Sequence, residues 1–190
     1  MTPNLEDLLR QLEAIKTDGH AVCAGLTESQ FNWRPGPTRW SMAECLVHLN
    51  ASVAHTLPAF DRAIEQGRAQ GRTAEGRQPF RYGWFAKWMV RSMEPPPKWR
   101  MKTFPIFDVP PARTHSLAQV LPEFLAVRDQ LAERVRRSDG LDLKRVRVVS
   151  PVNRLLRMPL GAYLQFVVAH DRRHLWQAKQ VRTAPTFGQA

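Results

Sequence analysis

Apolar residues recur every three or four positions in four long segments of this 190-residue chain. That spacing places them on one face of an α-helix, and each such face must be buried against another element. The segments begin near residues 3, 42, 117 and 159, and their apolar stripes include Leu5, Leu8, Leu12, Leu46, Val53, Val120, Phe124, Leu160, Leu164 and Val168. Long connections separate them. We therefore predict an all-α fold, a four-helix bundle in a single domain over residues 1–190.

Helix-boundary residues agree with these segments. Thr2-Pro3 offers an N-cap followed by a proline at the first helical position, and Ser41-Met42-Ala43-Glu44 has the spacing of a capping box. Ser116 is the predicted N-cap of the third long helix, and Pro159 suits the first turn of the last one. Pro58 is expected to kink the second helix or to end its first half, because proline cannot donate an intrahelical hydrogen bond.

Two connections carry weaker signals. Residues 25–40 hold several glycines, prolines and aromatic residues, which is typical of a short turn followed by an ordered aromatic loop. The sequence KRVRVV at 144–149 is strand-like, but a lone strand has no partner for its hydrogen bonds. We therefore assign it to the link between the last two long helices.

The middle of the chain, residues 72–116, is the least regular part. Its first aromatic residues, between 80 and 88, predict a short helix, and a proline-rich stretch follows from residue 95 to 111. A long Pro/Trp-rich loop of this kind is functional or disordered. We expect it to pack across one end of the bundle and to line a pocket, with Trp99, Arg100 and Phe104 as candidate binding residues. The alternative is a loop that only seals the core or forms a dimer contact.

Charge and composition limit the classes of partner. The chain has 28 Lys+Arg against 17 Asp+Glu, a formal net charge of +11. The basic residues are scattered and form no nucleic-acid signature, so they favour solubility or attraction of an anionic substrate over nucleic-acid binding. No apolar run approaches the length needed to span a membrane, and the acidic amphipathic N-terminus is not a signal peptide. Two cysteines provide no disulfide framework, so we predict a cytoplasmic protein.

The sequence His170-Asp171-Arg172-Arg173-His174 is the strongest candidate for a functional site. Histidines four residues apart lie on the same face of a helix, and neutral imidazole is a common ligand of transition metals. The alternative is a pair of half-buried histidines that only form hydrogen bonds. The motif is close to the zinc-protease pattern H-E-x-x-H, but no Asp, Glu, His or Cys follows His174. A zinc protease with a downstream ligand is excluded, and any further side-chain ligand must lie upstream.

Several blocks together resemble the DinB/YfiT-like superfamily. They are Trp33-Arg34-Pro35, WSMAECLVHL at 40–49, Leu160-Gly161 and HDRRHLWQ at 170–177, with a looser match of EPPPKWRMKTFPIF at 94–107. The resemblance implies a four-helix bundle that holds a divalent metal, Zn or Ni, through three histidines. By position, these ligands are His48, His170 and His174. Three imidazoles leave a coordination position for water or substrate, as in catalytic zinc sites.

Other residues in these segments have alternative interpretations. Asp171 stands where family members often have Glu, and its shorter side chain leaves open whether it has a catalytic role or is a surface or supporting carboxylate. His55, seven residues after His48, is a candidate accessory acid or base, or else an ordinary helix histidine. Cys45 is expected to be a buried thiol rather than a ligand. Gln177 is placed to orient a ligand, because it lies three residues after His174.

The resemblance implies two classes of function. The first is a metal-dependent small-molecule enzyme, a thiol S-transferase that uses a low-molecular-weight thiol such as bacillithiol or mycothiol. The metal would lower the pKa of the thiol, and the thiolate would attack an electrophile. A metal-dependent hydrolase is the enzymatic alternative. The second class is a non-catalytic metal-binding or stress-related bundle, since the fold alone does not determine function. We also expect a homodimer and no membrane partner.

Overall fold

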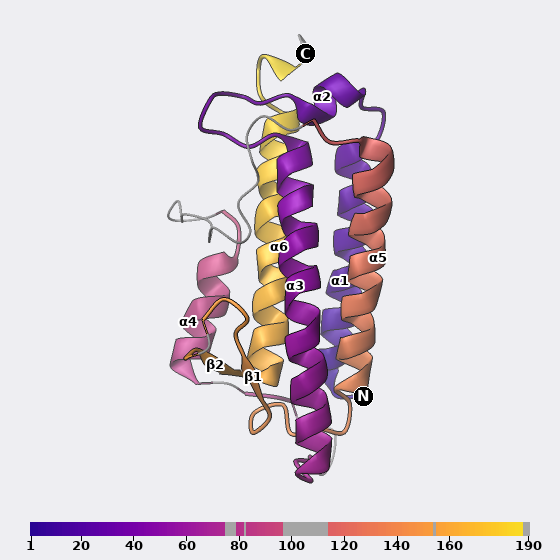
Figure 1. Cartoon of the computed structure of the whole chain (residues 1–190). Helices are drawn as coiled ribbons and strands as arrows, with labels where there is room; N and C mark the ends of the chain where they lie inside the picture. The colour runs from indigo at the N-terminus through magenta and orange to yellow at the C-terminus, as the bar shows by residue number, and fades with distance from the viewer. Residues whose placement is uncertain (75–78, 82, 97–113, 154, 188–190) are drawn as a thin grey trace.

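The computed structural model describes residues 1–74, 79–81, 83–96, 114–153 and 155–187. The protein is mostly helical, as predicted. Figure 1 shows the long helices side by side, with their axes along the length of the molecule. They are α1 (Pro3–Cys23), α3 (Met42–Ala69), α5 (Leu117–Arg137) and α6 (Leu160–Arg182). Within the described residues, no helix is both long and apolar enough to cross a membrane.

The core lies between these helices, because each one packs against two of the others. Helices α1 and α3 each contact both α5 and α6. The apolar stripes of the sequence supply the buried side chains, including Leu8, Leu12, Leu46, Leu49, Phe124 and Leu164, each at most 1% exposed. Helical spacing therefore identified the buried faces correctly.

The predicted helix boundaries are largely confirmed. At the start of α3 the hydroxyl of Ser41 accepts a hydrogen bond from the N–H of Glu44 (3.1 Å). The Glu44 carboxylate accepts one from the N–H of Ser41 (2.8 Å), which completes the capping box. Helix α3 does not end at Pro58 but continues to Ala69. Pro159 is the N-cap of α6 rather than part of its first turn.

A short helix, α2 (Glu28–Asn32), lies in the segment predicted to be a turn and a loop. Its capping box pairs Thr27 with Gln30, and that spacing is the sequence signal for the helix. The Glu28 carboxylate accepts a hydrogen bond from the N–H of Leu117 (3.0 Å), so it caps α5. Ser116 occupies the N-cap position as predicted, but its side chain makes no capping bond.

The all-α prediction missed a small antiparallel hairpin. Strand β1 (Arg147–Val149) pairs with β2 (Arg157–Pro159), and Val148 lies opposite Met158 in the buried register. The strand-like segment 144–149, which we had assigned to a link without a partner, thus contains a strand that pairs with β2. That partner is only three residues long and ends in a proline, so it lacks the alternation that reveals a strand in a sequence.

Helix α4 (Trp84–Met93) confirms the predicted short aromatic helix, and it packs along α6 (Figure 1). The largest of its aromatic side chains do not cover the core. Trp84 and Trp88 are 80% and 54% exposed, whereas the buried side chains are the smaller Ala86, Val90 and Met93. These smaller side chains allow α4 to approach α6 closely, and the rings are left on the outer face.

Candidate metal centre

Three histidines from two neighbouring helices meet in this fold. His48 lies two turns into α3, and His170 and His174 lie one turn apart on α6. One ring nitrogen from each histidine lies within 4.8 Å of the other two. His48 is 3% exposed, whereas His170 and His174 are half-buried. The group is therefore anchored in the core on one side and accessible on the other.

One pair of these nitrogens has the spacing of a tetrahedral metal site. Two imidazole nitrogens bound at 2.0–2.1 Å with a tetrahedral angle would lie about 3.4 Å apart. The Nε2 atoms of His48 and His170 are 3.3 Å apart. The ring centroid of His174 lies 4.6 Å from the centroids of both other histidines. The three side chains therefore form a group that could hold one metal ion.

The surroundings keep two of these rings neutral at pH 7. Burial, aided by the neighbouring histidines and Arg173, holds the pKa of His170 well below its ordinary value. Burial, with His48 and Arg173, also lowers the pKa of His174 to about 3, against a small opposing effect of Gln177. Only neutral imidazole has the lone pair that a metal needs. The site therefore favours the ligand form of these histidines.

Two side chains orient His174. The amide oxygen of Gln177 lies 3.1 Å from its Nδ1, so a protonated Nδ1 donates to Gln177 and leaves the Nε2 lone pair for a metal. The Trp40 ring stacks on the His174 ring with a centroid distance of 5.5 Å, and its centroid lies 5.0 Å from that of the His48 ring. The orienting position of Gln177 agrees with the prediction from its spacing. The contacts of Trp40, the last residue before the Ser41 cap, were not predicted.

A buried ionic network ties α3, α5 and α6 together beside the histidines. Arg128 donates from Nη2 to Asp171 Oδ1 (2.9 Å) and from Nε to Asp171 Oδ2 (3.2 Å), and both side chains are fully buried. Nη1 of Arg128 donates to Asn50 Oδ1 (2.9 Å), and the guanidinium lies 3.8 Å from the centre of the Phe124 ring. Burial raises the pKa of the Asp171 carboxyl, and Arg128 opposes that rise.

This network leaves a signal in the sequence, although we did not predict it. Arg128 follows Phe124 by four residues and precedes Leu131 by three, so it lies on the apolar stripe of its helix. Asp171 likewise lies on the apolar stripe of α6, three residues after Val168 and four before Leu175. Oppositely charged residues at core positions of two helices are expected to pair, since a buried unpaired charge is very unfavourable. The predicted roles of Asp171 were a catalytic group or a surface or supporting carboxylate. The surface role is wrong, because the side chain is fully buried, and Arg128 was not among the predicted partners.

Glu44 has a second partner besides Ser41. The Arg34 guanidinium donates to both carboxylate oxygens of Glu44, with Nε at 2.9 Å from Oε2. This bidentate pair fastens the loop after α2 to the first turn of α3, one turn before His48. Glu44 is therefore fully engaged in structural contacts, in agreement with the capping role inferred from the sequence.

The other candidate residues lie apart from the three histidines. His55 is exposed and does not belong to the group of potential metal ligands. Cys45 is fully buried, and burial raises the pKa of its thiol, so it is the inert buried thiol that we expected. The candidate binding residues Trp99, Arg100 and Phe104 lie outside the described residues.

The fold and site together describe a helical protein with three histidines able to hold a metal ion. A family model for the DinB superfamily matches residues 11–178, a range that contains all three histidines. The chain belongs to the DinB superfamily. Neither a search of curated proteins nor a search of solved structures found a significant match.

Proposed function

We propose that this protein binds one divalent metal ion, Zn or Ni, through His48, His170 and His174. The observation that carries the proposal is the convergence of the three rings, with the first two Nε2 atoms 3.3 Å apart. Without an ion, two neutral rings at this distance gain at most one weak hydrogen bond from each other. A shared cation explains why three imidazoles are gathered in a partly buried place.

We further propose that the protein is a metal-dependent small-molecule enzyme of the thiol S-transferase type. When bound by the three histidines, a divalent ion would lower the pKa of a thiol, so that the thiolate would be the nucleophile at neutral pH. The half-buried side of His170 and His174 is where the thiol and an electrophile would enter. Trp40 and Gln177 hold the His174 ring in place during the reaction.

We assign Asp171 to positioning rather than to proton transfer. Both of its oxygens accept hydrogen bonds from Arg128, and its side chain is fully buried. A general base needs an oxygen within hydrogen-bond reach of the substrate. The Arg128–Asp171 pair instead fixes α6 against α5, and through Asn50 against α3, so that the ligands of the two helices stay in register.

The test is turnover of a model electrophile, monobromobimane, with a panel of thiols that includes bacillithiol, mycothiol and glutathione. We expect the metal-loaded protein to accelerate conjugation with one thiol above the rate of the thiol alone. The variant His48→Ala/His170→Ala/His174→Ala should lose this acceleration, whereas His20→Ala, which removes an exposed histidine of α1, should keep it. Equal rates in the triple variant would contradict the metal-dependent mechanism.

The same protein samples separate the enzymatic alternatives. A thiol-independent release of product from an ester or amide substrate, lost in the triple variant, would favour a hydrolase. Metal binding with no acceleration for any thiol or hydrolysable substrate would favour the non-catalytic class. Either result would overturn the transferase proposal while leaving the metal proposal intact.

A further inference from the structure

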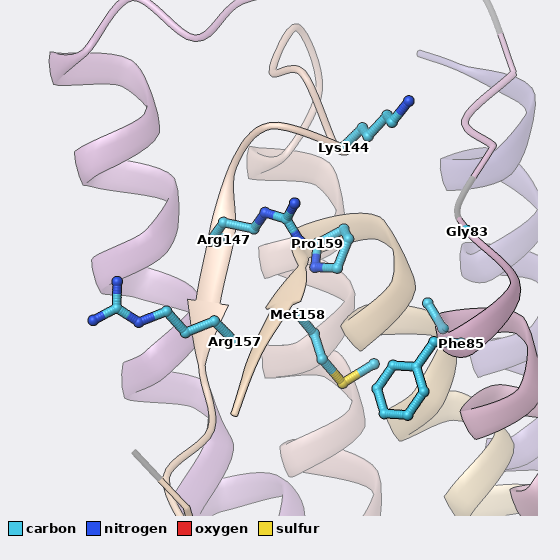
Figure 2. Close-up of a pocket in the computed structure, with 8 residues that line it drawn as sticks. Gly83, Phe85, Lys144, Arg147, Arg157, Met158 and Pro159 are labelled. Atoms are coloured by element: carbon cyan, nitrogen blue, oxygen red, sulfur yellow. The ribbon is translucent and has the colours of Figure 1, made fainter. Parts of the chain in front are cut away.

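A hollow of about 300 Å³ lies between α4 and the β hairpin, at the beginning of α6. Its walls are mainly apolar. Figure 2 shows the Phe85 ring and the Met158 side chain facing each other across it, with Pro159 beside them. Lys144 and Arg147 also line the hollow. This volume is at the lower end of the roughly 300–1,000 Å³ typical of ligand pockets.

The hollow carries positive charge that forms no ion pair with the part of the chain that the structure describes. Within the described residues, no ion pair involves Lys144, Arg147 or Arg157, whereas arginines of α5 and α6 pair with Asp or Glu. The chain has no acidic residue between Asp142 and Asp171. The Asp142 carboxylate accepts hydrogen bonds from two backbone N–H groups, those of Lys144 and Arg145, both at 3.0 Å. No described carboxylate pairs with these cations, which leaves their charge available for an external anion.

The hairpin register explains how these charges reach the surface. Val148 and Met158 face the core, so Arg147 and Arg157 project from the opposite, exposed side of the strands. In Figure 2 the Arg147 side chain extends toward Pro159, while Arg157 extends to the other side of the hairpin. A second, more polar hollow on that side is lined by Arg72, Gln66 and the same two arginines. We therefore regard Lys144 and Arg147 as the charged groups of the first hollow.

Exposed apolar side chains gather around the same place. Among the described residues, the large hydrophobic side chains that are exposed are Trp84, Phe85, Trp88, Val149 and Leu155. All of them lie on α4 or in the hairpin region. A concentration of exposed apolar surface commonly marks a binding site. A second copy of this chain is a poor occupant, because it would bring the same unpaired cations face to face.

We propose that this hollow binds a small organic anion with an apolar tail. The tail would lie between Phe85 and Met158, and the anionic headgroup would contact Lys144 and Arg147. The site is separate from the histidines: Met158 precedes His170 by twelve residues, which at 1.5 Å per helical residue places them roughly 15 Å apart or more. The inference does not depend on the proposed metal or transferase function.

The experiment uses the full chain with ¹³C-labelled methionine methyl groups and octanoate as the probe. A Met158→Leu variant identifies the Met158 methyl resonance. We expect octanoate to shift this resonance saturably. Neither acetate, which lacks the tail, nor octylamine, which carries the opposite charge, should give a saturable shift. The variant Lys144→Gln/Arg147→Gln should bind octanoate about tenfold or more weakly, since it loses charged hydrogen-bond donors.

A matched control removes two positive charges elsewhere. Arg10→Gln/Arg136→Gln changes two exposed arginines of α1 and α5 and should bind octanoate like the wild type. The triple-histidine variant should also keep wild-type affinity, and loss of binding there would place the anion at the histidines and overturn the proposal. An unmoved Met158 resonance, or equal affinity in the Lys144/Arg147 variant, would overturn it too.

The headgroup can come from a free acid or from a lipid, and vesicles distinguish these sources. Phosphatidylglycerol vesicles that broaden the Met158 resonance, in competition with octanoate, would assign the ligand to an anionic lipid. Octanoate binding with no effect of the vesicles would assign it to a free acid.

Discussion

Replacing Arg128 by Met should destabilise the protein strongly. The substitution keeps a long apolar side chain but removes both hydrogen bonds to the Asp171 carboxylate and the one to Asn50. The carboxylate stays fully buried and loses its counter-charge. Breaking a buried pair in this way typically lowers the free energy of unfolding by about 3–5 kcal/mol. That is a large share of the roughly 5–15 kcal/mol that stabilises an ordinary domain.

Urea unfolding of the metal-free protein, followed by circular dichroism, measures this effect. The double variant Arg128→Met/Asp171→Leu should recover much of the loss, because it leaves no buried charge. Arg134→Met on the same helix is the control: its partner Asp61 is 25% exposed, so we expect a loss of about 1 kcal/mol or less. A loss for Arg128→Met as small as that of the control, or a double variant less stable than Arg128→Met, would refute this account.

Three further predictions concern packing, pH and ligand orientation. Gly19→Ala should destabilise the protein by about 1–3 kcal/mol in urea unfolding, because the new methyl group would lie 2.5 Å from the buried Phe124 ring; an unchanged midpoint would contradict it. The pKa of His174 is lowered to about 3 in the folded protein, so the unfolded chain binds more protons between pH 3 and 6.5. The free energy of unfolding of the metal-free protein should therefore fall as the pH drops through this range. A His174→Leu variant should lose less stability on acidification, and equal slopes would count against the shifted pKa. Gln177→Leu should weaken Zn²⁺ binding about 10–100-fold in a competition titration, since Nδ1 of His174 loses its acceptor; wild-type affinity would exclude this role.

Much of the helical architecture was readable from the sequence because long amphipathic helices leave a repeated signal. The stripe of α6 and the capping box at Ser41 identified two elements and the register of the histidines on them. His170 and His174 needed only helical spacing to be placed together. His48 was reached through the resemblance to the DinB/YfiT-like superfamily, because spacing along one chain cannot reveal which helices become neighbours.

The remaining features depend on contacts between distant parts of the chain. The hairpin was missed since each strand is three residues long and is defined by its partner. Arg128 and Asp171 are 43 residues apart, and they become a pair only because α5 and α6 both pack against α1 and α3 and face each other across the core. The aromatic residues between 80 and 88 predicted a short helix but not which of its faces is exposed, and Trp84 and Trp88 lie on the exposed face. Which side chains of a short helix are buried depends on the face that packs against its neighbour, and amino-acid composition does not predict that face.

Metal content per chain tests the central claim most directly. Protein loaded with Zn²⁺ or Ni²⁺ and freed of excess ion by gel filtration should retain about one ion per chain, because three convergent imidazoles form a specific site. The variant His48→Ala/His170→Ala/His174→Ala should retain almost none while keeping its helical circular dichroism, and His20→Ala should match the wild type. Undiminished metal in the folded triple variant would contradict the three-histidine site.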